Sequence, residues 1–187
     1  MSKINDCVVR AIVELLNSYK SLQTEQEKSS VHYLLGQLVR TYRIADDHVH
    51  ISKSAKATWE KITSDDISDK WFHQTVKCDW VTTPISLSFF TGSMKSGESR
   101  VVHKNDTFQF NKVFHVDHVT PVSLILSDLK NLNQIDETSV AEILNKMHIC
   151  RILKTEDRRL GRTKERSLNY EEVIEKIYNP NNVEIFQ

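Results

Sequence analysis

The sequence predicts a mixed α+β protein with a helical N-terminal region, and two patterns carry this prediction. Apolar residues recur at helical spacing through roughly the first sixty residues and again after Pro121. Between them, residues 71–119 alternate apolar and polar side chains, which is typical of half-buried antiparallel strands. The spacing of apolar residues changes from helical to strand-like at the acidic stretch 64–69. We therefore expect a helical region over residues 1–64, serving recognition or dimerisation, and a second domain over residues 65–187.

The N-terminal region is expected to hold three amphipathic helices. The first has its apolar stripe at positions 9, 12, 13, 16 and 19, and the second follows a polar break at residues 23–28. Ser30 is the expected N-cap of this second helix, whose stripe runs over residues 31–42. A shorter third helix is expected over residues 54–62.

Strands and helices then alternate along the rest of the chain. Expected strands are residues 76–80, 85–89, 101–103, 108–110, 113–119 and 149–153. Expected helices are residues 122–132, residues 139–147, a basic helix opening near Thr155 and a last helix capped by Asn169. The aromatic residues expected in the core of this part are Trp71, Phe72, Trp80, Phe89 and Phe90.

Composition excludes several classes of protein. The 187 residues carry 25 Lys+Arg against 25 Asp+Glu, and 4 Gly with 3 Pro exclude collagen-like or linker-dominated material. No apolar run approaches the roughly 20 residues that cross a bilayer, and the first residues lack the apolar stretch of a signal peptide. The 3 cysteines form neither a disulfide framework nor a CxxC pair. We expect a cytoplasmic protein with no membrane partner.

Positive charge is concentrated in residues 151–166. Seven Lys or Arg side chains stand against three acids there, which leaves 7 − 3 = +4 in a chain of zero net charge. Such a cluster can bind a polyanion, with an attraction that weakens as salt rises. The alternative is a solvated helix face whose charges pair at i, i+4 spacing.

An acid and a histidine adjoin at the end of the strand expected over residues 113–119. Successive strand residues point to opposite faces, so Asp117 and His118 face one pocket only if the strand ends or bends there. Pro121 supplies such an end. On its own an Asp-His dipeptide most commonly means a surface pair or a hydrogen-bonded histidine at a strand end.

The chemistry-bearing residues stand in a recognisable order. The strand with Asp117-His118-Val119-Thr120-Pro121 is followed by the strand 149–153 and then by the helix opening Glu156-Asp157-Arg158-Arg159. This order resembles the HNH, or ββα-metal, nucleases, and residues 116–121 are similar to the matching strand of the HNH domain in CRISPR effector nucleases. The resemblance covers roughly residues 113–166. It implies a ββα-metal core, with extra antiparallel strands and the helical region added.

The resemblance also implies roles for single residues. Asp117 falls on the family's first metal ligand and His118 on its general base, with Mg²⁺ or Mn²⁺ as the cofactor. The family's final ligand, Asn or His, falls on Arg159, which cannot bind a cation. Glu156 and Asp157 are the available substitutes, although acids in a first helical turn are also favoured by the helix dipole.

Other residues complete the expected site. His115 shares a strand face with Asp117, so it is expected to reach the phosphate or the metal, or else to be a structural histidine. The expected nucleic-acid contacts are Arg158, Arg159, Arg162 and Lys164.

The leading functional hypothesis is a metal-dependent HNH endonuclease acting on DNA, such as a restriction, phage or mobile-element nuclease. A homodimer is expected if both strands of a duplex are cut. One alternative is a non-catalytic regulator or inhibitor, binding nucleic acid or protein on a degenerate nuclease fold. Another is an RNase of the same fold, because no feature separates RNA from DNA.

Overall fold

A computed structural model describes residues 3–67, 73–88, 99–160 and 166–186. The protein is α+β, as expected, and its chain divides into two compact units that each combine separate segments. Unit 1 comprises residues 1–48, 118–148 and 166–173, and unit 2 comprises residues 49–117, 149–165 and 174–187. The predicted boundary at residue 64 lies inside unit 2. Among the described residues, no helix combines the length and apolarity needed to cross a bilayer.

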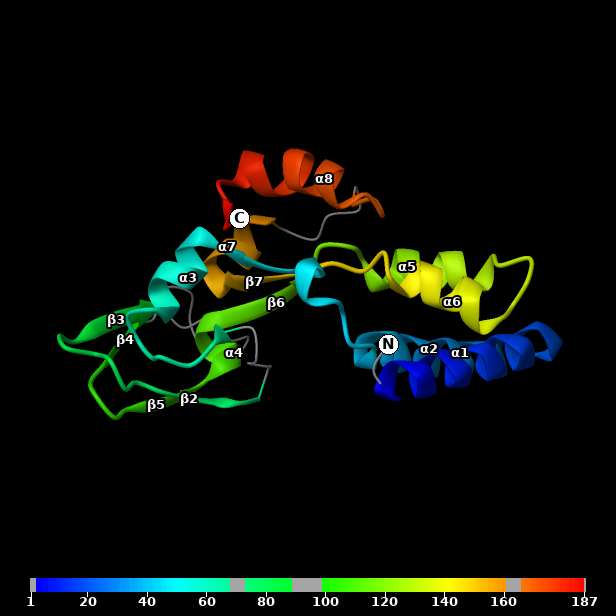
Figure 1. Ribbon diagram of the computed structural model, residues 1–187, viewed down its shortest axis with the longest axis horizontal. Coiled ribbons are helices and arrows are strands. Elements are labelled where there is room, and N and C mark those ends of the chain that lie inside the picture. Colours follow the sequence, from blue (N-terminus) through cyan, green and yellow to red (C-terminus); the bar gives the residue numbers. More distant parts are fainter. Residues whose placement is uncertain (1–2, 68–72, 89–98, 161–165, 187) are drawn as a thin grey trace. The chain divides into compact units, whose positions relative to one another are not determined.

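Unit 1 is a bundle of four main helices. They are α1 (Lys3–Ser21), α2 (Glu25–Thr41), α5 (Val122–Lys130) and α6 (Glu137–Leu144) (Figure 1). The unit also contains the short turn η1 (Asp46–His48) and α8 (Tyr170–Val173). Helix α1 packs against α2 and α6, and α5 packs against α2 and α6.

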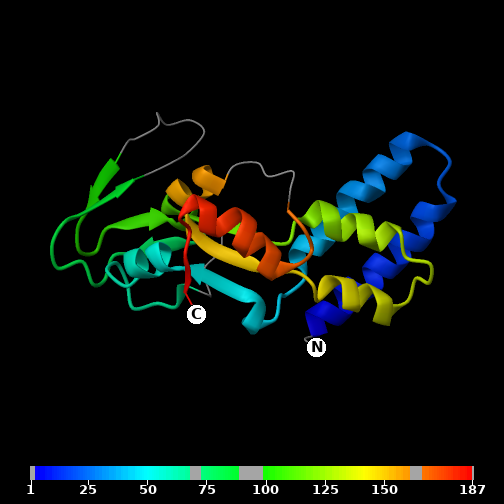
Figure 2. The same cartoon turned by 90° about the horizontal axis from the view of Figure 1, so that it is seen from above.

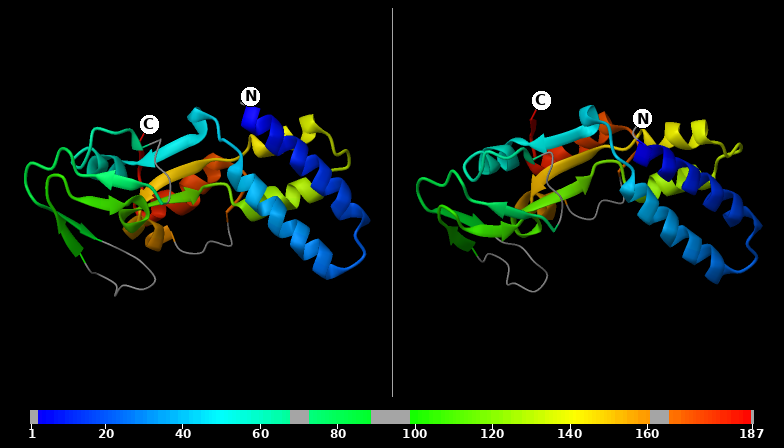
Figure 3. Two further views of the ribbon diagram at one scale, coloured as in Figure 1. Left: turned by 90° about the horizontal axis from the view of Figure 1, so that it is seen from below. Right: turned by 60° about the horizontal axis from the view of Figure 1, so that its bottom comes forward.

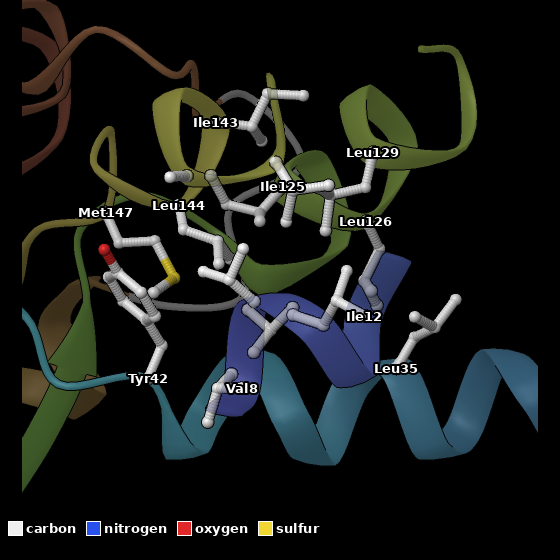
Figure 4. Packing of buried hydrophobic residues seen from close by; sticks show 14 of the residues in the cluster. Val8, Ile12, Leu35, Tyr42, Ile125, Leu126, Leu129, Ile143, Leu144 and Met147 are labelled. Carbon is white, nitrogen blue, oxygen red and sulfur yellow. The ribbon is translucent and has the colours of Figure 1, made fainter. Parts of the chain in front are cut away.

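The apolar faces of these helices form one core, which Figure 4 shows from close by. The expected stripe of the first helix is partly confirmed, because Val9, Ile12 and Leu16 are buried in it. The core draws on all four helices: Val8, Val9, Ile12 and Leu16; Leu35 and Val39; Ile125, Leu126 and Leu129; Val140, Ile143 and Leu144.

The start of the second helix is a correction to the sequence prediction. Helix α2 begins at Glu25, and its N-cap is Thr24 rather than Ser30. The Thr24 hydroxyl accepts from Glu27 N at 3.2 Å, and the Glu27 carboxylate accepts from Thr24 N at 3.2 Å. This reciprocal capping box satisfies two backbone N–H groups, so the helix starts within the stretch that had been interpreted as a polar break.

Unit 2 is built around a four-stranded sheet in the order β6-β7-β1-β8. The strands are β1 (Val49–Ser52), β6 (Phe114–His118), β7 (Ile149–Leu153) and β8 (Ile185–Phe186). Strand β1 is parallel to β7, with Ile51 opposite Arg151, and antiparallel to β8, with Ser52 opposite Ile185 (Figure 2). Figure 3 shows β6, β7 and β1 in a row. The expected strand 149–153 is confirmed at both ends.

Two helices join the strands of this sheet to the rest of the unit. Helix α3 (Lys53–Trp59) follows β1 with Ser52 as its N-cap, and α7 (Lys154–Leu160) follows β7 without a linker. The Trp59 ring packs edge-on against Phe114 with centroids 5.3 Å apart. The sequence placed the third helix over residues 54–62, and the structure ends it at Trp59.

The remaining strands form two antiparallel pairs. Strand β2 (Thr75–Lys77) pairs antiparallel with β5 (Thr107–Gln109), and β3 (Ile85–Ser88) pairs antiparallel with β4 (Ser99–Val102). Helix α4 (Phe110–Val113) connects β5 to β6. Trp80, which was expected in the core, is 56% exposed, and the other four aromatic residues of that prediction lie outside the described residues.

The C-terminal segment, residues 174–187, is the last part of unit 2. A π-helical turn η3 (Ile174–Tyr178) and a 3-10 turn η4 (Asn179–Asn181) lead into β8. The last helix is capped as expected, because the Asn169 side chain accepts from Glu172 N at 3.1 Å.

Candidate metal centre

Three metal-binding side chains gather in unit 2. His115 and Asp117 come from β6 and Asp157 comes from the first turn of α7. One potential ligand atom from each residue lies within 4.8 Å of the other two. His115 Nε2 is 3.7 Å from Asp157 Oδ1. This cluster joins three of the residues that the sequence put forward.

Local structure explains why these residues meet. His115 and Asp117 are two positions apart on β6, so their side chains leave the same face of the strand. Strand β7 lies beside β6 in the sheet, and α7 begins directly after β7. The first turn of α7 therefore brings Asp157 to the side chains of β6.

Asp117 is buried, and its carboxylate accepts a hydrogen bond from another buried side chain. Asp117 is 8% exposed, and its Oδ2 accepts a hydrogen bond from the hydroxyl of Tyr178. Tyr178 is fully buried at the end of η3. The sequence did not single out Tyr178, and no local signal links two residues 61 positions apart.

Glu156 has a different environment from its neighbour Asp157. It is 1% exposed, and its Oε2 accepts from Ser52 Oγ at 2.6 Å and from Leu153 N at 2.8 Å. Its Oε1 lies 3.9 Å from Arg159 Nη2. These contacts connect the start of α7 to the end of β1, and Glu156 is not one of the three clustered residues.

Positive charge accompanies the cluster. Burial lowers the pKa of Lys154, the Asp157 carboxylate opposes this shift, and Lys112 adds to it. Arg158 and Arg159 are exposed on α7. Arg162 and Lys164 were also expected to contact nucleic acid, and they lie outside the described residues.

His118 is the last residue of β6, and a bend at residues 119–120 follows it, so the strand ends where the sequence required an end. His118 falls in unit 1, whereas the cluster belongs to unit 2. Its backbone carbonyl accepts from Arg166 Nη1 at 2.7 Å within unit 1. Its role as general base stays a prediction.

The three side chains are of the kinds that could hold a metal ion. Around Mg²⁺, ligand atoms at about 2.1 Å lie roughly 3 Å apart when adjacent and about 4.2 Å apart when opposite. The 3.7 Å between His115 Nε2 and Asp157 Oδ1 lies between these two spacings, and the 4.8 Å that bounds the whole group is longer than both. Two carboxylates suit Mg²⁺ or Mn²⁺, and the imidazole adds affinity for the transition ion.

Comparison with known proteins adds no family to this picture: family models, curated proteins and solved structures were all searched, and none matches the chain.

Proposed function

We propose that this protein is a metal-dependent endonuclease of the HNH type, which hydrolyses phosphodiester bonds in DNA. The observation that carries the proposal is the cluster of His115, Asp117 and Asp157. The order of elements supports it, because β6 and β7 are neighbours in the sheet and helix α7 follows β7 directly, although α5 and α6 stand between the two strands in the chain. A ββα-metal core has this succession of strand, strand and helix.

The cluster suggests how the chain would hold its metal. Asp117 and Asp157 would supply carboxylate oxygens, and His115 would supply an imidazole nitrogen, because these donors meet within 4.8 Å. When bound, a divalent ion supplies electrostatic stabilisation of the charge that develops on the phosphate and on the leaving oxygen. Asp157, one of the two acids that the sequence offered, would take the position of the family's final ligand.

The surrounding charge suits a phosphate backbone. Arg158 and Arg159 are exposed on the helix that carries Asp157, and Lys154 is half-buried at the start of the same helix. Charge-assisted hydrogen bonds from such side chains to phosphate oxygens would orient the nucleic acid. Removal of a proton from the attacking water is assigned to His118, in line with the sequence prediction.

The test is cleavage of supercoiled plasmid DNA by the purified chain. We expect nicked or linear DNA with Mg²⁺ or Mn²⁺, and none with EDTA. Asp117→Asn and Asp157→Asn should each abolish cutting, because both remove a ligand charge while preserving shape. Glu142→Gln, an exposed acid on α6, is the matched control and should cut normally.

Two results would count against the proposal. Cutting by Asp117→Asn and Asp157→Asn at the parental rate would show that the activity does not come from the cluster. Cutting of RNA substrates, run in parallel, with no cutting of DNA would replace the proposed substrate by RNA.

Linear product formed without a nicked intermediate would favour the homodimer expected from the sequence.

A further inference from the structure

A buried tyrosine touches the carboxylate at the centre of the cluster. The Tyr178 hydroxyl donates to Asp117 Oδ2, and Tyr178 itself is 0% exposed. Because it is fully buried, Tyr178 has no room to contact a substrate. Its hydroxyl reaches the cluster at Asp117.

Backbone hydrogen bonds fix the chain at Tyr178 and after it. The Tyr178 carbonyl accepts from Val183 N at 3.0 Å, across a turn in which Asn182 takes a left-handed backbone conformation with φ 54°. Val183 is fully buried, and the Glu184 carbonyl then accepts from Lys53 N at 2.8 Å. The tyrosine is therefore held by a turn that is itself tied to α3 and, through β8, to β1.

The local helix geometry also favours a functional role for the segment that carries Tyr178. Residues Ile174–Tyr178 form a π-helical turn, a geometry that is rare in proteins and recurs at functional sites. Metal-binding carboxylates are themselves hydrogen-bonded by outer groups, which fix the orientation of the carboxylate plane. A hydroxyl on Oδ2 provides this constraint for Asp117.

We infer that Tyr178 is a positioning residue for the metal ligand Asp117, and that it couples metal binding to the C-terminal segment 174–186. This inference rests on the metal centre of the proposed function. It adds a residue and a segment that lie outside the strand, strand and helix of that centre. A purely structural tyrosine would affect the stability of the fold and leave metal affinity unchanged.

The experiment measures Mn²⁺ binding by calorimetry in the full chain. We expect Tyr178→Phe to weaken binding by roughly 10- to 100-fold, the range for loss of a partner behind a metal ligand. Tyr42→Phe is the matched control, because Tyr42 is also buried and its hydroxyl donates to Asn145 Oδ1 at 2.7 Å in unit 1. This variant should bind Mn²⁺ like the parent.

Rescue separates positioning from packing. Replacing Tyr178 by 4-aminophenylalanine retains an N–H donor on the same ring, so binding should recover toward that of the parent. Equal Mn²⁺ affinity in the parent and in Tyr178→Phe would overturn the inference while leaving the metal centre intact. Absence of Mn²⁺ binding by the parent would instead refute the proposed function.

A second measurement needs no variant and therefore does not depend on the folding of Tyr178→Phe. Hydrogen exchange of the parent is compared with and without Mn²⁺. We expect the ion to slow exchange in residues 174–183, because a ligated Asp117 holds Tyr178 more firmly. Unchanged exchange in this segment, with the metal bound, would contradict the coupling.

Discussion

Replacing Ser52 by alanine tests the junction that orients the first turn of α7. The Ser52 hydroxyl donates to Glu156 Oε2 at 2.6 Å and accepts from Ala55 N at 3.1 Å as the N-cap of α3. Ser52 is 0% exposed and Glu156 is 1% exposed, so water does not replace the lost donor. One substitution thus removes a helix cap and a buried hydrogen bond to a carboxylate.

The two losses can be added as an order of magnitude. An N-cap contributes about 1 kcal/mol, and a hydrogen bond to a charged group contributes about 1.5–3 kcal/mol. We expect Ser52→Ala to lower the free energy of unfolding by about 3 kcal/mol. With a urea dependence of about 2 kcal/mol/M, the midpoint should fall by roughly 1.5 M.

Tryptophan fluorescence during urea unfolding is the appropriate assay, because all 3 tryptophans of the chain fall in unit 2. Ser54→Ala, at an exposed position of the same helix, should leave the midpoint almost unchanged. Ser52→Gly also removes both hydrogen bonds, but glycine at an N-cap costs only about a few tenths of a kcal/mol, so most of its shift would come from the lost Glu156 hydrogen bond. If Ser52→Ala shifts the midpoint no more than Ser54→Ala does, the Ser52–Glu156 contact does not support the fold.

Two further predictions concern unit 1. Leu144→Ala, at a 1% exposed site, should lower the free energy of unfolding by about 2–5 kcal/mol, measured by urea unfolding followed by circular dichroism. The control Leu34→Ala, at a half-exposed site, should lower it by less than about 0.5 kcal/mol. Equal losses in the two variants would contradict the described core. Hydrogen bonds from the Thr24 side chain and backbone hold the pKa of Glu27 below 4.5, so this stabilisation is present above that pH and is lost as pH falls through the folded value. Thr24→Ala should therefore reduce the acid sensitivity of the melting temperature, and an unchanged profile would count against the capping box.

Local patterns predicted the elements well where side chains carry their own signal. Strand 149–153 and the Asn169 cap are confirmed, because a short run that is apolar except for Arg151 and a capping amide act within a few residues. The start of α2 was misplaced because its apolar stripe begins only at Val31, although Thr24 and Glu27 spelled out a capping box. Trp80 was wrongly expected in the core: Val76 and Cys78 of the same alternating run are buried, but β2 ends at Lys77, so Trp80 is not part of the strand.

The candidate site shows the same limit. The spacing of His115 and Asp117 on one strand was enough to predict that their side chains share a face. For the third residue the sequence left two adjacent acids, Glu156 and Asp157, and the structure brings Asp157 into the cluster. Which of the two faces the strand depends on the rotation of α7, and burial of Glu156 against Ser52 fixes that rotation. Tyr178 lies beyond any local pattern, because its position depends on how the C-terminal segment packs in the folded unit.

The interleaving of the two units has a consequence for how the protein is made. The chain passes from one unit to the other at five places, after residues 48, 117, 148, 165 and 173. During synthesis α1 and α2 leave the ribosome before α5 and α6. The apolar faces of α1 and α2 that pack against α5 and α6 therefore stay uncovered while about 80 further residues are added. No uninterrupted stretch of the gene encodes either unit, and a dissection of this protein into expressible halves would have to splice distant segments together or permute the chain.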